Sequence, residues 1–283
     1  MRLAVALLAF LCAPAVVHAQ APEGTLKKIR DSKTITIAYR TDALPFSFEE
    51  NKQPSGYTVE LCKRIVASIE QQLKIQPLQV KWVAATSQNR IELVRKGAVN
   101  MECGSTTATL SRMEQVDFSH PVFVDTTGLL VRRSSGATSL GGLGGRKIAV
   151  VGATTNQKAL ENALKRQLVS ATVVPVKDRD DGIAALEAGT VDALASDKIL
   201  LGGLIGKVKD PSLYGMLADD LGYEPYAIVL PRGDAPFRLA VNRALARIYG
   251  SGAIVEVFRR AFGPQAQPSP ALALMYELNT YPD

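Results

Sequence analysis

The sequence has few of the side chains that hold metals or carry out covalent catalysis. Its 283 residues include three Cys, two His and one Trp. A zinc site needs about three or four N, S or O ligands, and the HExxH, paired CxxC and GxSxG patterns are all absent. His120 stands directly before a proline, which favours a structural role. We therefore expect no metal, no cofactor and no catalytic residue.

Aromatic residues are also sparse, and the basic residues do not form a run. Aromatics make up 6% of the chain, and 33 Lys and Arg against 27 Asp and Glu give a formal charge of +6. Proteins that bind single-stranded nucleic acid combine a basic groove with aromatic stacking platforms. Neither is indicated here, so we expect no nucleic-acid partner.

The glycine-rich segment 141–145 has the composition of a phosphate-binding loop but the wrong surroundings. A phosphate loop follows a strand and opens a helix. This segment follows a loop and opens a predicted strand, so we interpret it as a surface turn.

The only long apolar run lies at the N-terminus. Arg2, the apolar stretch 3–17 and the small-residue pattern ending at Ala19 predict a secretory signal peptide, residues 1–19, cleaved near Ala19. The run is short for a membrane-spanning helix, so we expect it to be removed and the mature chain to be soluble and exported. Its two cysteines, Cys62 and Cys103, could form a disulfide or remain two buried thiols, and the sequence leaves both open.

Strands and helices are expected to alternate along the mature chain, which indicates an α/β fold with mainly parallel sheets. In the first part, β-branched alternation and apolar residues at three- and four-residue spacing predict strands and helices in turn. The predicted strands are 34–39, 78–83 and 98–103, and the predicted helices are 57–73 and 88–96, the latter capped by Ser87.

The same order recurs later in the chain. The predicted strands are 147–151, 171–176 and 190–195. A first predicted helix is capped by Thr154 or Thr155 and runs through residue 167. Two more helices are predicted at 180–188 and 198–207. Residues 91–100 align with 183–192 at a constant offset that places Ser105 over Asp197. This indicates either two similar lobes or a chance likeness of helix–Gly–strand units.

Two apolar segments, 122–131 and 223–230, could be strands that cross between the lobes. Helices 236–249 and 253–262 and a Pro-rich tail from Pro264 follow the second crossing. If these helices rejoin the first lobe, that lobe is discontinuous and the second lobe is inserted.

Polar side chains follow five of the predicted strands. Ligands of open α/β sheets bind beyond the carboxyl ends of strands. Arginine suits bidentate carboxylate recognition, helix N-termini favour anions, and a buried Asp favours a cation such as ammonium. These residues predict a small zwitterion with excess negative charge, unless they are ordinary caps and surface ion pairs. They are Arg40, the stretch 86–90, Ser105 to Thr107 with Arg112, Thr154 and Thr155, and Asp197.

These residues also resemble a known family. The stretches 86–91 and 102–107, Arg112 with 116–119, and Pro45-Phe46 followed by Gly56-Tyr57 are similar to the polar amino-acid-binding proteins of bacterial ABC importers, and most of all to the glutamate/aspartate-binding branch. The resemblance implies a two-lobed type II venus-flytrap fold, with two crossing strands as the hinge. Lobe 1 would comprise residues 20–126 and 226–283, and lobe 2 residues 127–225.

The resemblance also implies roles for the polar residues. Arg112, aided by Thr107 and Thr155, would hold the α-carboxylate of the ligand, and Asp197 and Ser105 the α-ammonium. The side-chain carboxylate would be held by Arg40, Ser87 and Arg90. Arg179 stands where the branch has His, and it would either add a ligand contact or point to solvent.

The implied protein is a monomer that binds L-glutamate or L-aspartate and delivers it to a membrane permease, and it is not an enzyme. The alternative is an exported enzyme on the same fold, similar to cyclohexadienyl dehydratase. Such an enzyme needs a placed general acid, and Glu102 and Asp197 are the only candidates. We interpret Glu102 as structural, because its place near the end of a strand sets it before the turn.

Overall fold

The computed structural model describes residues 23–282. The predicted signal peptide lies outside these residues. None of the helices within them is long and apolar enough to cross a membrane.

The first part of the chain alternates strands and helices as predicted. The elements are β1 (Thr34–Arg40), α2 (Tyr57–Leu73), β5 (Gln79–Ala85), α3 (Arg90–Arg95) and β6 (Met101–Cys103). The prediction of a cap by Ser87 is wrong, because α3 begins later, at Arg90, and the Ser87 hydroxyl accepts a hydrogen bond from Arg40 instead. Smaller elements complete this part, namely α1 (Gly24–Ser32), β2 (Asp42–Ala43), β3 (Ser47–Glu50), β4 (Gln53–Ser55) and α4 (Leu110–Met113).

The second part repeats the order. Its main elements are β8 (Lys147–Val151), α5 (Thr155–Arg166), β9 (Thr172–Val176), α6 (Arg179–Ala188), β10 (Ala193–Asp197) and α7 (Lys198–Ile205). Thr154 is the residue that caps α5, since its side chain accepts from the backbone N–H of Gln157. The glycine-rich segment forms a short 3₁₀ helix (Leu140–Leu143) and a turn whose glycines are exposed.

The constant offset between the two parts is visible in the structure. Gly97 and Gly189 occupy matching positions after α3 and α6, and both have a left-handed backbone, with φ of 69° and 71°. Glycine adopts this conformation without the penalty that a Cβ adds. β6 and β10 then begin at Met101 and Ala193, which the offset also aligns.

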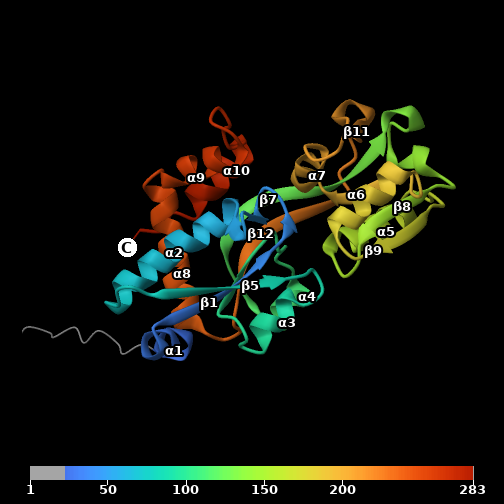
Figure 1. Cartoon of the computed structure of the whole chain (residues 1–283). Coiled ribbons are helices and arrows are strands. Elements are labelled where there is room, and N and C mark those ends of the chain that lie inside the picture. The colour runs from blue at the N-terminus through green and yellow to red at the C-terminus, as the bar shows by residue number, and fades with distance from the viewer. Residues whose placement is uncertain (1–22, 283) are drawn as a thin grey trace, which may run out of the picture.

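One nine-stranded sheet runs through both parts, in the order β5-β1-β6-β12-β7-β10-β8-β9, with β11 (Tyr214–Met216) paired to β7. β1 is parallel to β5 and β6, and β8 is parallel to β9 and β10. The central strands β7 (Asp117–Arg132) and β12 (Gly222–Leu230) are antiparallel to each other. Figure 1 shows these two strands passing from one lobe to the other.

The C-terminal helices return to the first lobe. α8 (Ala235–Gly250) and α9 (Ala253–Phe262) pack against α2. Their apolar side chains join those of α2 and β1 in one core cluster. The tail was predicted only as Pro-rich, but it contains a further helix, α10 (Pro270–Leu278), capped by Ser269 with a proline in its first turn.

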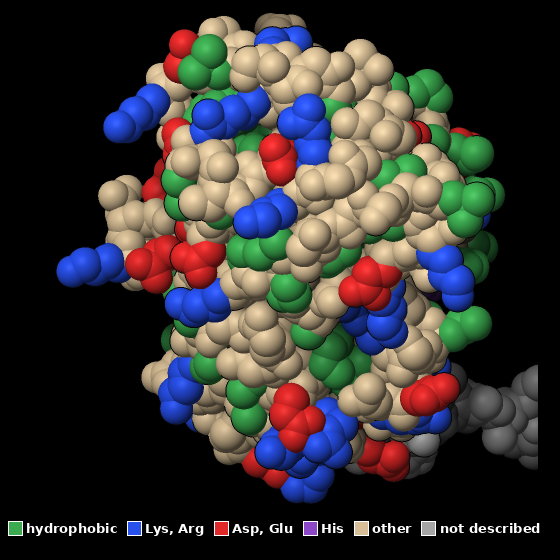
Figure 2. Space-filling view, turned by 90° about the vertical axis from the view of Figure 1, so that its right-hand side faces the viewer, with side chains coloured by type: hydrophobic (Ala, Val, Ile, Leu, Met, Phe, Trp, Pro, Cys, Tyr) green, Lys and Arg blue, Asp and Glu red, His purple; other side chains and the backbone are tan. Residues whose placement is uncertain are grey.

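The second lobe has separate apolar clusters on the two faces of its sheet, one under α5 and one under α6 and α7. The outer face of this lobe carries acidic and basic side chains interspersed with one another (Figure 2). In the first lobe, a disulfide joins Cys62 of α2 to Cys103 of β6, with an S–S distance of 2.02 Å and a Cα–Cα distance of 6.4 Å.

Candidate functional site

The strand-end residues of the two lobes meet at the crossing strands. Thr107, which follows β6, and Thr155, which opens α5, have hydroxyl oxygens 3.2 Å apart. Asp42 in the first lobe and Arg179 in the second form an ion pair at 3.2 Å. The candidate site therefore lies where the lobes meet, and side chains from both contribute to it.

Two arginines of the first lobe are buried beside Ser87. Arg40 is 1% exposed and donates from Nη2 to the Ser87 hydroxyl at 3.0 Å, and Arg90 is 3% exposed. The Nε and Nη1 atoms of both arginines are buried without a hydrogen-bond partner. Buried polar atoms are almost always paired, so these four nitrogens are available to donate to a bound ligand.

Burial also perturbs both guanidinium groups. It lowers the pKa of Arg40 to about 10, assisted by repulsion from Arg90, and it lowers the pKa of Arg90 to about 10, assisted by repulsion from Arg112. Both groups remain cationic at neutral pH. This end of the site is therefore positively charged and poorly solvated, which favours a carboxylate ligand.

Arg112 lies next to this pair, on the short helix α4 that follows the turn after β6. Its Nη1 donates to the backbone oxygen of Thr107 at 2.7 Å, which fixes the guanidinium against the turn. Burial lowers the pKa of Arg112, while Glu224 and Glu102 act in the opposite direction. The structure therefore brings together Arg40, Ser87, Arg90 and Arg112, and their roles toward a ligand stay a prediction.

Arg179 is held in a network that crosses between the lobes. It is 2% exposed and donates to the Ser196 hydroxyl at 3.1 Å, to Asp42 at 3.2 Å and to Asp197 at 3.5 Å. Burial alone would lower its pKa, but Asp42 and Asp197 outweigh that effect and raise it. Of the two alternatives for Arg179, the structure excludes the one in which it points to solvent.

Asp42 is a site residue that the sequence analysis missed. One carboxylate oxygen accepts from Nη2 of Arg40 and the other from Nη1 of Arg179. Burial would raise its pKa, but the two arginines outweigh burial and lower it. A carboxylate only two residues beyond Arg40 at the end of β1 was the signal that could have identified it.

The same network also contains buried acidic groups, since Asp197 accepts from Arg179. Asp197, at the end of β10, is 3% exposed, and Ser105 is 4% exposed with an unpartnered hydroxyl. Asp125 on β7 lies nearby, and burial, together with the charge of Asp197, raises its pKa to about 7. A cationic group in this region would be stabilised by the acidic side chains.

Glu224 on β12 is the second residue that the sequence analysis missed. It is 1% exposed and accepts hydrogen bonds from Thr107, from Thr155 at 2.6 Å, from Thr127 at 2.7 Å and from Asn156 at 3.4 Å. Burial and the charge of Asp197 raise its pKa. A lone acidic residue within an otherwise apolar strand was the available signal.

Glu102, one of the two candidate acids for an enzyme, is bound by the turn that follows β6. It is fully buried and accepts from the Thr106 hydroxyl at 2.7 Å. A Cβ on Gly104 would lie 2.2 Å from Glu102 Oε1, so glycine is required for the turn to close over this carboxyl group.

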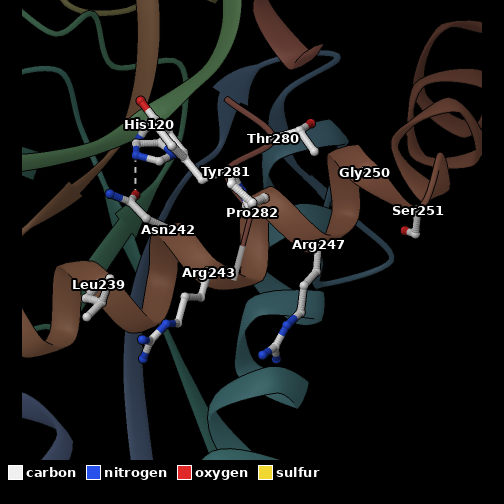
Figure 3. A pocket seen from close by; sticks show the side chains of 11 residues that line it. His120, Leu239, Asn242, Arg243, Arg247, Gly250, Ser251, Thr280, Tyr281 and Pro282 are labelled. Atoms are coloured by element: carbon white, nitrogen blue, oxygen red, sulfur yellow. Dashed lines mark hydrogen bonds between the residues drawn. The ribbon is translucent and has the colours of Figure 1, made fainter. Parts of the chain in front are cut away.

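A separate cavity of about 780 Å³ lies on the far side of the first lobe. It is lined by α8 and the C-terminal residues, including His120, Asn242 and Tyr281 (Figure 3). His120 donates its backbone N–H to the Asn242 side chain at 2.9 Å and lies against the Tyr281 ring. His120 does not belong to the site between the lobes.

Known proteins with similar sequences include solute-binding proteins. The chain is 33% identical to the L-glutamate/L-aspartate-binding protein of Pseudomonas aeruginosa, over 94% of this chain and 87% of that protein. It is 31% identical to the glutamate/aspartate import solute-binding protein of Escherichia coli, over 92% of this chain and 86% of that protein. These relatives are binding proteins rather than enzymes, and this confirms the prediction that the chain is not an enzyme.

The fold is shared with solved structures of this class. The L-cysteine solute receptor of Neisseria gonorrhoeae superposes with a TM-score of 0.75 at 24% identity, covering 86% of this chain and 97% of that chain. This confirms the two-lobed α/β binding-protein fold. Residues 35–264 match the family model "Bacterial extracellular solute-binding proteins, family 3". The chain therefore belongs to the family 3 bacterial extracellular solute-binding proteins.

Proposed function

We propose that the protein is the periplasmic component of an ABC importer that captures glutamate or aspartate and delivers it to a membrane permease. One observation supports the acidic specificity above all, namely the four unpartnered guanidinium nitrogens of Arg40 and Arg90. A carboxylate can accept two parallel hydrogen bonds from a guanidinium fork. A neutral amide offers these donors no negative charge, so glutamine and asparagine should bind more weakly.

The remaining residues fit the two ends of an amino acid. Arg112 would hold the α-carboxylate, and the N-terminus of α5 at Thr155 would contribute, since the first N–H groups of a helix have no partner within it. Asp197 and Ser105 would receive the α-ammonium. Arg179 would act through Asp42 and Asp197, because its guanidinium is already bonded to both.

Binding would proceed by closure of lobe 1 (20–126 and 226–283) on lobe 2 (127–225). β7 and β12 connect the lobes, so rotation about these strands would bring the two walls together. The Asp42–Arg179 ion pair would form only on closure, because its partners belong to different lobes. We expect a monomer whose signal peptide is removed near Ala19 before the chain acts in the periplasm.

A thermal-shift screen of the twenty amino acids on the mature chain tests the proposal. A ligand at 100 times its Kd adds about 2.7 kcal/mol to the free energy of unfolding. We expect this stabilisation with L-glutamate or L-aspartate. If no amino acid raises the Tm, the proposed function is wrong, and if only neutral or basic amino acids do, the acidic specificity is wrong.

A further inference from the structure

We infer that Gly203 on α7 is a positioning residue for ligand capture, because it leaves room for the β2–β3 hairpin of lobe 1 (residues 42–50) to pack against lobe 2 when the lobes close. The inference rests on the proposed function, since it concerns closure around the same ligand. It assigns to a residue that contacts the opposite lobe a role in the affinity for every ligand alike.

Gly203 and Leu44 belong to different lobes, and their backbones lie in contact. A Cβ on Gly203 would lie 2.6 Å from the backbone oxygen of Leu44 and 3.2 Å from its carbonyl carbon. These distances are shorter than the optimal separation of non-bonded atoms. Gly203 lies within α7 and is not among the residues with a left-handed backbone. Space, rather than backbone conformation, is therefore the reason for glycine at this position.

The hairpin has little freedom to move away from a larger residue. The Phe46 N–H donates to the backbone oxygen of Ala43 at 2.7 Å, and the Tyr57 N–H donates to that of Pro45 at 2.9 Å. The Phe46 side chain is fully buried and lies against the rings of Tyr57 and Phe123. Because the hairpin is fixed within lobe 1, a methyl group at position 203 would be accommodated by moving α7 away from it.

α7 contributes apolar side chains to both lobes. Leu201 and Leu204 belong to a core cluster of the second lobe. Leu200 belongs to the core cluster of the first lobe, and Ile199 packs against that cluster. Gly203 follows these two residues at three- and four-residue spacing, which places it on the same face of the helix. α7 also lies beside the crossing strand β7 (Figure 1). The face that carries Gly203 therefore packs on lobe 1.

A second contact joins the same hairpin to α6, which packs against α7. Asp42 begins the hairpin and accepts from Nη1 of Arg179, the first residue of α6, at 3.2 Å. Both side chains are buried. The hairpin thus meets lobe 2 at two neighbouring helices. Contacts that form only in the closed arrangement raise its population, and they therefore raise the affinity for every ligand by the same factor.

The test compares Gly203→Ala with Gly202→Ala. The two glycines are neighbours on α7, so each substitution adds one methyl group and a similar gain in helix propensity. Gly202→Ala is the matched control, because a Cβ on Gly202 would meet nothing within 4 Å. Calorimetry gives the Kd for L-glutamate and for L-aspartate. Gly203→Ala should weaken both by one common factor, about fivefold to a hundredfold, as overpacking of a contact does. Gly202→Ala should change each Kd by less than about twofold.

Urea unfolding of the ligand-free variants separates closure from a purely structural role. If the contact forms on closure, opening of the lobes relieves the added methyl group, and Gly203→Ala should unfold at the same urea concentration as Gly202→Ala. A less stable or unfolded Gly203→Ala would assign the contact to the permanent packing of the fold and overturn the inference.

Two binding results would also overturn the inference and leave the proposed function standing. One is equal Kd values for the two variants. The other is a ratio of L-glutamate to L-aspartate affinity that differs between Gly203→Ala and the wild type, because closure affects both ligands alike. Failure of the wild type to bind any amino acid would instead overturn the proposed function, and the inference with it.

Discussion

Substituting Arg90 with methionine should stabilise the ligand-free protein and weaken ligand binding. Arg90 is 3% exposed, and two of its nitrogens lack hydrogen-bond partners. Burial, with repulsion from Arg112, lowers its pKa to about 10. One pKa unit corresponds to about 1.4 kcal/mol, so the charged form is about 3 kcal/mol less favourable here than in water.

Methionine fills a similar volume and carries no charge. Replacing buried charges with well-packed apolar side chains is often stabilising by about 1–4 kcal/mol. We therefore expect Arg90→Met to raise the unfolding free energy of the ligand-free protein by about 1–3 kcal/mol in urea titrations. With L-glutamate the effect should reverse, because loss of one side of a buried charge pair weakens binding by about 2–5 kcal/mol.

Arg95→Met is the matched control on the same helix. The Arg95 side chain is 48% exposed and pairs with Glu92 on the surface, so its loss should change stability by less than about 1 kcal/mol and leave Kd unchanged. The reasoning would be refuted if Arg90→Met bound L-glutamate as tightly as the wild type. If ligand-free Arg90→Met were less stable than the ligand-free wild type, the view that Arg90 is an uncompensated charge would be refuted.

Two further predictions concern stability. Burial raises the pKa of Asp125 to about 7, so the folded state binds this proton more tightly than the unfolded state, and stability from this group is lost as the pH rises from about 4 to 7. The unfolding free energy of Asp125→Asn, measured in urea titrations, should therefore rise by about 2–4 kcal/mol relative to that of the wild type as the pH is raised from 4.5 to 7.5. Parallel pH profiles of the two proteins would contradict this. Removing the disulfide by Cys62→Ala with Cys103→Ala should lower the unfolding free energy by about 2–4 kcal/mol, and an unchanged urea midpoint would contradict that.

The sequence predicted those helices and strands whose pattern of apolar residues matches the core that they pack against. The helix at 57–73 was predicted with its observed bounds, because apolar side chains at three- and four-residue spacing face the core that it buries. The glycines at 97 and 189 indicated the ends of α3 and α6, because a helix often ends at a residue with a left-handed backbone and glycine adopts that conformation readily.

What the sequence did not reveal depends on contacts between distant residues. Ser87 has the chemistry of a helix cap, but it bonds to Arg40, which lies 47 positions away in the chain. Asp42 and Glu224 were missed because their importance comes from partners on the other lobe, Arg179 and Thr107. No local pattern identifies such pairs, whereas a strand-end arginine can be recognised from its neighbours alone.

The most direct test of the account is the ratio of the dissociation constants for L-glutamate and L-glutamine, measured by calorimetry on the mature wild-type protein. The two ligands have nearly the same shape and differ in one negative charge, which the unpartnered nitrogens of Arg40 and Arg90 would receive. The account predicts that L-glutamate binds at least about thirtyfold more tightly, as expected for a charge-assisted contact in a buried site. Equal affinities, or tighter binding of L-glutamine, would contradict it.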